Sequence, residues 1–280
     1  MIDAFKGSLL ASASTTNKSE NQDAHGSVTG NPSALFIADG IGSFSRAREA
    51  AAHVIERFKV FVQQCPEPSS NENIRAMFKD AAESLAALAK EDVVDAKGDI
   101  NRYGTTAIIV FDTEDEIVLA YVGNGAAWHI RPNFRSFKVH PPWSAVNILN
   151  PHTVQESGKE ALERYLSDEP DSNRYKPTII RIAKDYHQGD IVMICTDGVH
   201  SADQQRMGRI PNDPVLWIRH NDRMSRFYEE MTALLDSKET MTQDSLRTAS
   251  ERFLERVKSS LDDDATIGVL VTPEVLSGTK

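Results

Sequence analysis

The strand-like segments of this chain follow one another instead of alternating with helices, and this order limits the folds it can adopt. Strand-like apolar runs lie at residues 34–39, 105–111, 116–123, 126–131, 178–183, 190–197 and 265–271. Apolar residues recur at helical spacing in residues 45–64, 71–92, 225–235 and 245–261. A doubly wound parallel sheet needs strands and helices in alternation, so the order favours an α+β fold with packed antiparallel sheets.

The chain is expected to form a single domain over residues 1–280. A polar turn at residues 112–115 predicts an antiparallel hairpin between its flanking runs. The run at 34–39 and the last run are expected to pair, because neither half of the chain makes a complete sheet alone. With 280 residues, 40% of them hydrophobic, the chain has enough apolar area for a full core.

Residues 138–176 do not fit the strand pattern and are expected to form a loop-rich excursion at the surface. They begin rich in Pro and Asn, pass through a short helical candidate near residues 158–166, and end in a polar stretch. Residues 202–222 are also expected to be irregular. Since surface loops often carry specificity, the excursion is a candidate for the segment that selects a ligand.

The net charge of −10 argues against nucleic acid or an anionic membrane as the main partner, and it is compatible with cation binding. Cys65 and Cys195 belong to no metal-ligand spacing, and Cys195, inside an apolar run, is expected to be a small buried hydrophobe. No run of 18 apolar residues and no signal-like N-terminus occurs. The default expectation is therefore a reduced, cytoplasmic protein.

Aspartates border several strand-like runs. Asp39 and Asp197 each stand at the end of a run and before a glycine, Asp23 precedes the first run, and residues 262–264, all aspartate, precede the last. Carboxylates at strand ends can form an oxygen-rich pocket of the kind that Mg²⁺ and Mn²⁺ prefer. A following glycine lets the backbone approach an ion, so that its carbonyl can join the ligands. Two such ions could hold a hydroxide for in-line attack on phosphorus.

Each of these aspartates alone is more typical of a turn or a solvated loop than of a metal site, and only their order along the chain is distinctive. The ordered segments are NQDA (21–24), ADGIG (38–42), YGTTAIIVF (103–111), LAYVGNGAAW (119–128), GDIVMICTDGV (189–199) and DDDATIGVLV (262–271). They resemble the metal-dependent type-2C serine/threonine protein phosphatases, the PPM family, as a bacterial-like divergent member. The resemblance implies an αββα four-layer sandwich, with two antiparallel sheets flanked by helices.

The resemblance also implies a binuclear Mn²⁺ or Mg²⁺ site with Asp39 and Asp197 as the catalytic residues. Asp39 would bridge both ions, and the Gly40 carbonyl would be an added ligand. Asp197 and Asp263 would hold one ion. Asp23 would hold the other, directly or through water.

Two further positions follow from the family pattern. Asp263 fits the ligand spacing better than Asp262, and Asp264 takes the place of the residue beside the ligand. Lys18 falls where the family usually has an arginine that binds the substrate phosphate. Lysine keeps the charge but loses the bidentate fork. Lys18 could equally be an ordinary surface lysine.

The chain departs from the family in residues that serve a third, weaker metal site. Asn124 replaces an aspartate, and Ser201 replaces an aspartate or asparagine four residues after Asp197. Losing charge at both positions implies that the third ion is absent or weakly bound. The histidine that follows the first Asp-Gly in some members is also missing, and His25 is either a substitute acid or a structural residue.

The excursion is the expected flap, and it differs from the family. Its segment HPPWSAVNILNPHT contains His140, Trp143 and His152. These side chains could shape a substrate groove, or they could pack within a rebuilt loop. Substrate selection is therefore the least direct implication of the resemblance.

The residues leave three functions open. The first is a metal-dependent hydrolase that removes phosphate from phosphoserine and phosphothreonine with a metal-bound hydroxide, in signalling with a phosphorylated protein substrate and a cognate serine/threonine kinase. The second is a catalytically weak or inactive pseudophosphatase that binds phosphoproteins. The third is a hydrolase of small phosphoesters.

Overall fold

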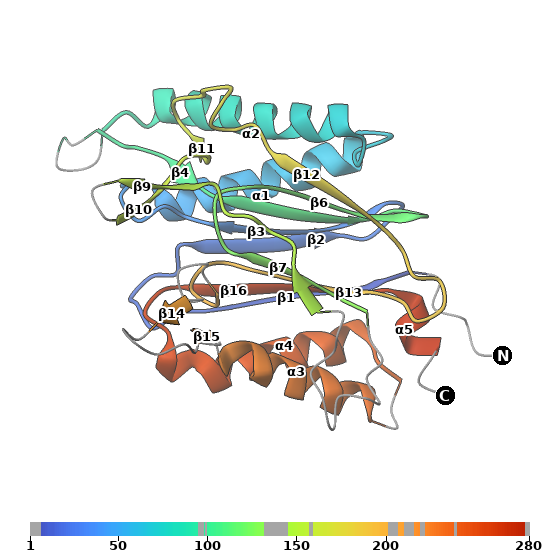
Figure 1. Cartoon of the computed structure of the whole chain (residues 1–280). Helices are drawn as coiled ribbons and strands as arrows, with labels where there is room; N and C mark the ends of the chain where they lie inside the picture. The colour runs from blue at the N-terminus through green and yellow to red at the C-terminus, as the bar shows by residue number, and fades with distance from the viewer. Residues whose placement is uncertain are drawn as a thin grey trace.

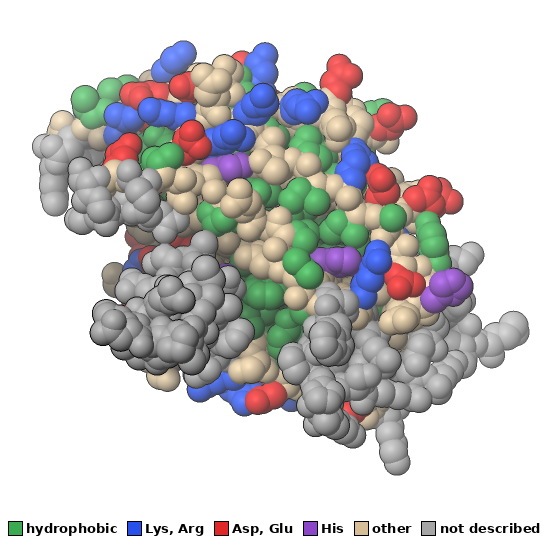
Figure 2. Space-filling model, in the orientation of Figure 1, with side chains coloured by type: hydrophobic (Ala, Val, Ile, Leu, Met, Phe, Trp, Pro, Cys, Tyr) green, Lys and Arg blue, Asp and Glu red, His purple; other side chains and the backbone are tan. Residues whose placement is uncertain are grey.

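The computed structural model describes residues 7–94, 98, 100–131, 145–156, 159–200, 207–209, 216–218, 222–237 and 240–277. Four layers lie on one another: a pair of helices, an antiparallel sheet, a second antiparallel sheet and a second pair of helices (Figure 1). The predicted α+β class and αββα sandwich are therefore confirmed. On the face shown in Figure 2, charged side chains of both signs are interspersed along the top of the molecule, where the outermost helix meets solvent.

The first sheet lies against helices α1 (Ala47–Gln64) and α2 (Asn71–Glu91). Its strands, in pairing order, are β12 (Thr178–Ala183), β6 (Glu116–Val122), β5 (Ala107–Asp112), β3 (Ser33–Asp39) and β2 (Asp23–Val28). β5 and β6 form the predicted hairpin. Phe58 of α1 lies between Phe36 of β3 and Phe78 of α2, with ring centroids 6.2 and 5.1 Å away. The apolar faces of both helices thus continue the core outward from the sheet.

The second sheet lies against helices α3 (Asp222–Leu235) and α4 (Gln243–Val257). Its strands, in pairing order, are β1 (Leu9–Thr15), β16 (Ala265–Val271), β13 (Ile191–Cys195), β7 (Ala126–Ile130) and β8 (Ala145–Asn147). α4 begins at a capping box formed by Thr242 and Ser245 and continues into a 3₁₀ turn, Lys258–Ser260. The chain then passes through β16 to a short helix, α5 (Pro273–Ser277).

The central strands of both sheets are buried on both faces, which explains why these strands are continuous apolar runs. β13 and β16 are buried along their whole length, and Cys195 is fully buried as predicted. Where the sheets face each other, a Cβ on Gly268 would lie 2.8 Å from Leu35 Cδ2. The glycine therefore lets the two sheets approach closely. None of the helices formed by the described residues combines the length and apolar character that crossing a bilayer requires.

The first strand of the chain was not predicted. β1 reads LLASAST, in which small and polar residues give a weak strand signal. β16 pairs with β1 on one side and with β13 on the other. The run at 34–39 is β3, a strand of the other sheet, so its expected pairing with the last strand is wrong. The two instead face each other across the core.

Two loop expectations also need correction. The helix expected near residues 158–166 is absent from the described residues 159–166: β10 (Lys159–Leu162) pairs with β9 (Thr153–Glu156), and β11 (Leu166–Ser167) pairs with β4 (Gly104–Thr105). Strand pairing overrides the helical propensity of this segment. Within residues 202–222, which were expected to be irregular, β14 (Met207–Arg209) and β15 (Leu216–Ile218) form a short hairpin.

Candidate metal centre

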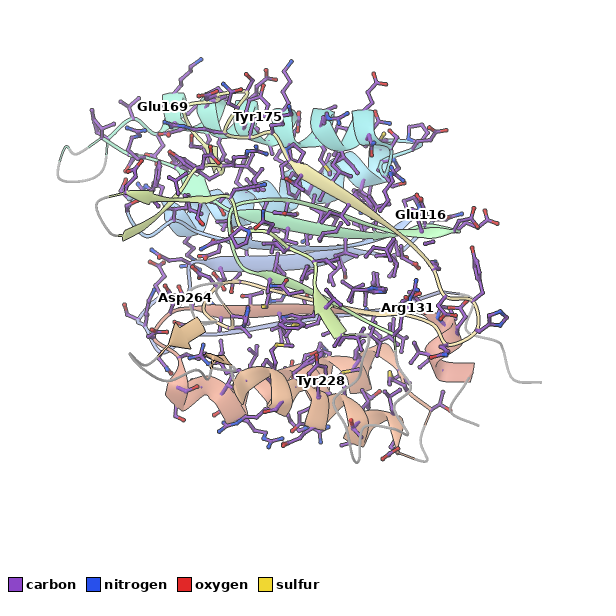
Figure 3. All side chains as sticks on the ribbon, viewed as in Figure 1. Glu116, Arg131, Glu169, Tyr175, Tyr228 and Asp264 are labelled. Atoms are coloured by element: carbon purple, nitrogen blue, oxygen red, sulfur yellow. The ribbon has the colours of Figure 1, made fainter. Side chains whose placement is uncertain are left out.

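The aspartates identified in the sequence converge at one end of the sandwich. Asp23 begins β2 and Asp39 ends β3, and the antiparallel register sets these two residues opposite each other. In the second sheet, Asp197 follows β13 and Asp264 precedes β16, its neighbouring strand. Asp264 is labelled in Figure 3 at this end of the molecule. Carboxylates from segments far apart in the sequence are therefore brought together by the strand ends.

Thr196, the residue before Asp197, ties the two sheets together at this end. Its backbone N–H donates to Thr266 O, and its hydroxyl accepts from Thr266 N, each over 3.0 Å. The same hydroxyl donates to Asp23 Oδ2 of the other sheet over 2.9 Å. The sequence does not single out Thr196, because its only signal is one threonine in the segment Thr-Asp-Gly. It orients the Asp23 carboxylate by a fixed hydrogen bond.

Asp39 lies at the centre of the acidic cluster. Burial, together with the neighbouring carboxylates of Asp23 and Asp197, raises the pKa of the Asp39 carboxyl well above its usual range. Burial also raises the pKa of Asp23 to about 7, against the opposing effect of hydrogen bonds from Thr266 and Thr196. If all of these carboxyl groups were ionised, their protein partners would not neutralise the negative charge of the cluster.

One oxygen of this cluster has no hydrogen-bond donor. Asp23 Oδ1 is buried, and none of the described residues donates to it. An ionised carboxylate oxygen buried in this way is costly unless a cation or a proton compensates it. Together with the raised pKa of Asp39, this oxygen fits the chemistry of a hard divalent cation, which takes oxygen ligands.

The carboxylates do not yet stand in a ligating arrangement. Among the residues whose side chains are described, no three His, Cys, Asp or Glu groups already form a metal-binding cluster.

Gly40 is required by the packing of the chain itself. A Cβ at this position would lie 2.5 Å from Ala47 O and 2.8 Å from Gln22 O. Gly40 N donates to Gln22 O over 3.2 Å, which joins the end of β3 to the residue before Asp23. The glycine therefore permits a close approach of three backbone segments around the cluster.

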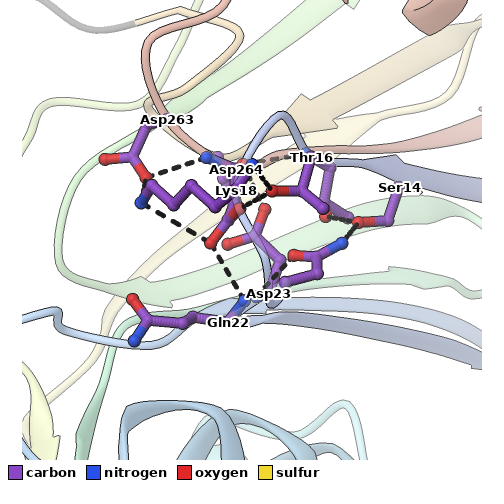
Figure 4. A network of polar contacts seen from close by, with 10 residues as sticks. Ser14, Thr16, Lys18, Gln22, Asp23, Asp263 and Asp264 are labelled. Atoms are coloured by element: carbon purple, nitrogen blue, oxygen red, sulfur yellow. Dashed lines mark hydrogen bonds and ion pairs between the residues drawn. The ribbon is translucent and has the colours of Figure 1, made fainter.

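The two aspartates before β16 have different surroundings (Figure 4). Asp264 is buried, and it accepts hydrogen bonds from the Thr16 hydroxyl and, over 2.9 Å, from Gln22 N. The Asp263 side chain is 53% exposed and forms an ion pair with Lys18. Lys18 Nζ also lies 3.7 Å from Asp264 Oδ2. Asp263, the preferred ligand from the sequence, is thus linked to the cluster through Lys18.

Lys18 is held at the rim of the cluster by these carboxylates. Burial lowers the pKa of its ammonium, but the contact with Asp263 and the charges of Asp264 and Asp39 outweigh burial and raise that pKa. Lys18 is therefore a charged group at the rim of the acidic cluster.

Asn124 lies beside Asp197. Its side-chain amide donates to Asp197 Oδ2 over 2.7 Å. Asn124 stands between Gly123 and Gly125, both with φ of +101°, a conformation that favours glycine. A Cβ on Gly125 would lie 2.4 Å from Cys195 O, so the turn packs directly on the end of β13. Ser201, the other predicted departure, lies outside the described residues.

The histidine candidates have structural partners. His25 Nδ1 lies 2.8 Å from the Ser12 hydroxyl. His152 is buried, stacks on Tyr121 and approaches the Thr178 hydroxyl to 2.7 Å. His152 therefore packs against β6 and β12 instead of lining an exposed groove. His140 and Trp143 lie outside the described residues.

Comparisons with known proteins agree with this arrangement. The family model described as Protein phosphatase 2C matches residues 12–249. The serine/threonine phosphatase PstP/Ppp of Mycobacterium tuberculosis has a TM-score of 0.62 at 16% identity, over 95% of this chain and 99% of that chain. The catalytic domain of PstP in complex with two manganese ions also has a TM-score of 0.62 at 16% identity, over 95% and 98% of the two chains.

A third solved structure, the serine/threonine phosphatase Stp1 from Staphylococcus aureus, gives the same result. Its TM-score is 0.62 at 16% identity, over 95% of this chain and 94% of that chain. No curated protein matches the chain in sequence. At such low identity, the solved structures establish the shared fold alone.

Proposed function

This chain belongs to the protein phosphatase 2C family, and we propose that it is a metal-dependent phosphoprotein phosphatase acting on phosphoserine and phosphothreonine. The proposed centre takes two Mn²⁺ or Mg²⁺ ions. When bound, such ions activate a water molecule for in-line attack on phosphorus and neutralise charge on the phosphoryl group. Residues 1–280 are proposed to act as one catalytic domain, with residues 138–176 as its flap.

The proposed ligands come from both sheets. Asp39 would bind both ions, and the Gly40 carbonyl would be an added ligand. Asp23, whose carboxylate is already oriented by Thr196, would hold one ion. Asp197 and Asp263 would hold the other ion. Asp39 and Asp197 are the proposed catalytic residues, because the buried Asp39 carboxyl interacts directly with the carboxylate of Asp197 from the other sheet.

Lys18 is proposed to bind the substrate phosphate. Its ammonium is free to leave Asp263 because both side chains are partly exposed, 42% for Lys18 and 53% for Asp263. A cation at Asp263 would replace this ion pair, and the Lys18 ammonium could then contact a phosphate oxygen as a point charge. A third ion is proposed to be absent or weakly bound, because Asn124 offers Asp197 an amide donor instead of a second carboxylate.

The observation that carries the proposal is the surplus of negative charge around Asp39. The carboxylates of Asp23 and Asp197 raise its pKa together with burial, and Asp23 Oδ1 has no donor among the described residues. Lys18 is a single positive charge at the rim, whereas a purely structural cluster would be expected to pair each buried carboxylate with a basic group. Two divalent cations would compensate all three carboxylates.

Hydrolysis of p-nitrophenyl phosphate and of a phosphothreonine peptide tests the proposal. Both reactions should require Mn²⁺ or Mg²⁺, and Asp39→Asn should lower the rate about a hundredfold or more, since loss even of a residue that only supports a ligand costs roughly 10–100-fold. A folded preparation with no activity in any divalent cation would contradict the proposal. Activity on the small ester but on no phosphopeptide would favour a small-molecule phosphatase.

A phosphoprotein-binding pseudophosphatase is the second candidate. The ion pair between Lys18 and Asp263 favours it, because a lysine can replace a cation at a proposed ligand. In that case, the chain would bind a phosphopeptide without Mn²⁺ and would not hydrolyse it. For either function, the proposed partners are a phosphorylated protein and the serine/threonine kinase that produces it.

A further inference from the structure

Arg223, near the start of α3, connects the two loops of the second sheet that carry proposed ligands. Its Nη1 donates to Gly198 O over 2.7 Å and to Val199 O over 3.3 Å, in the turn that follows Asp197. Its Nη2 donates to Ser260 O, at the end of the 3₁₀ turn that leads to Asp263. One guanidinium therefore spans both loops.

The same two loops touch directly at Gly198. A Cβ on Gly198 would lie 1.8 Å from Asp264 O and 2.8 Å from the Asp264 carbonyl carbon. The backbone that follows Asp197 is thus pressed against the backbone that follows Asp263. A small change in the distance between the loops would change the distance between the two carboxylates.

The chemistry of arginine suits this position. The guanidinium presents several donors in a fixed plane, so it can bind carbonyls of two segments at once, whereas lysine offers a single point charge. A positive charge at the end of α4 is also favourable, because the last carbonyls of a helix lack intrahelical partners.

We propose that Arg223 is a positioning residue, which holds Asp197 and Asp263 at the separation at which both can bind one cation. This role rests on the proposed phosphatase function and deepens it. Arg223 itself does not touch the cation or the substrate. It acts through the backbone of the two loops.

Arg226 provides a matched control. It lies about one turn further along α3, and its Nη1 donates to Arg256 O over 2.7 Å. Like Arg223, it places a guanidinium at the C-terminal end of α4. Among the described residues, its contact with the backbone is confined to that end, whereas Arg223 also contacts Gly198. A role limited to helix capping predicts the same behaviour for both residues.

The test is calorimetric titration of the full chain with MnCl₂, combined with thermal unfolding in EDTA. We expect Arg223→Met and Arg226→Met to lower the melting temperature by similar amounts. Only Arg223→Met should weaken one of two Mn²⁺ sites, by about tenfold, the lower end of the range for residues that orient ligands. If Arg223→Met does not fold, Arg223→Gln, whose amide reaches one carbonyl at most, is judged by the same criterion.

Three results would overturn the proposal or support it. Equal Mn²⁺ affinity in both variants and the wild type would show that Arg223 is only a helix cap, while the phosphatase proposal would stand. A wild-type chain that binds no Mn²⁺ would overturn the proposed function and the positioning role with it. A selective loss in the Arg223 variant alone supports the proposal.

Discussion

The Asn124 side chain donates a hydrogen bond to Asp197 Oδ2 over 2.7 Å, at the edge of the acidic cluster. An aspartate at position 124 could not donate when ionised, and it would add a negative charge beside Asp197. The Asn124 amide therefore stabilises the Asp197 carboxylate. Two carboxylates at these positions would repel each other unless a cation lay between them.

Asn124→Asp should recover an additional cation site. In EDTA the variant should be less stable than the wild type by about 1–3 kcal/mol, because a donor is lost beside a charged group. Mn²⁺ should reverse this loss, and titration calorimetry should detect one more, weaker, ion per chain. Asn73→Asp on α2 is the control, since it changes the charge equally but far from the cluster. Unchanged stoichiometry in Asn124→Asp would contradict the assignment.

Lys18→Gln should change metal and substrate binding in opposite directions. The ion pair with Asp263 is partly exposed, so it contributes about 0.2–1 kcal/mol, and its loss should strengthen Mn²⁺ binding by about two- to fivefold. The KM for a phosphopeptide should rise, because the phosphate loses a positive contact. Calorimetry and steady-state kinetics measure the two effects. Lys18→Arg, which keeps the charge, should not raise KM, and a rise there would argue against phosphate binding.

Gly198→Ala should force apart the loops that carry Asp197 and Asp264. The added methyl group would lie 1.8 Å from Asp264 O, a backbone atom that cannot move alone. We expect a loss of about 1–3 kcal/mol in the free energy of unfolding, as is typical of overpacking, together with weaker Mn²⁺ binding. Gly30→Ala, whose nearest neighbouring atom is 3.7 Å away, should be nearly neutral in the same denaturant titration.

His152 should make stability fall in acid. Burial, with a smaller effect of Arg164, lowers the pKa of His152 from 6.5 to about 4 in the folded chain. The folded state therefore favours the neutral ring, and the unfolded state binds the proton more readily. The contribution of His152 is fully present above pH 6.5 and is lost as the pH falls toward 4, by up to about 3 kcal/mol.

Urea unfolding between pH 7 and pH 4 measures this dependence. His152→Gln should be less stable at pH 7 but should lose less stability toward pH 4. His187→Gln, at an exposed turn, should keep the wild-type slope. A wild-type slope in His152→Gln would show that other groups cause the acid sensitivity.

The sequence predicted the parts of the fold whose burial is uniform. β16 is buried on both faces, and its residues 265–271 were predicted as one strand with the bounds that the structure shows. β1, with its alternating small and polar residues, and the pairing of β10 with β9 depend on neighbours that are distant in sequence, so local propensity did not reveal them.

The candidate site was likewise predicted from the sequence only in part. Asp23, Asp39 and Asp197 were found from their order along the chain, and the structure brings their carboxylates together. Thr196 and Arg223 were not found, because their roles depend on contacts with Asp23 and Ser260 that no local pattern encodes. The different surroundings of Asp263 and Asp264 likewise depend on Lys18, 245 residues before Asp263.

Asp39→Asn should have opposite effects on the metal-free and the metal-bound chain. Replacing this carboxylate by an amide of the same size removes a charge that burial, Asp23 and Asp197 all disfavour. In EDTA the variant should therefore unfold at a higher temperature than the wild type. Stabilisation by Mn²⁺ and hydrolysis of phosphoester should both be lost, since the proposed bridging ligand is gone.

Calorimetric titration of the metal-free wild type and of Asp39→Asn with MnCl₂ tests the central claim most directly. The account predicts two ions per wild-type chain and loss of this binding in Asp39→Asn, with the variant more stable than the wild type in EDTA. Absence of binding to the folded wild type, or equal binding to both proteins, would contradict the assignment of a binuclear centre at Asp39.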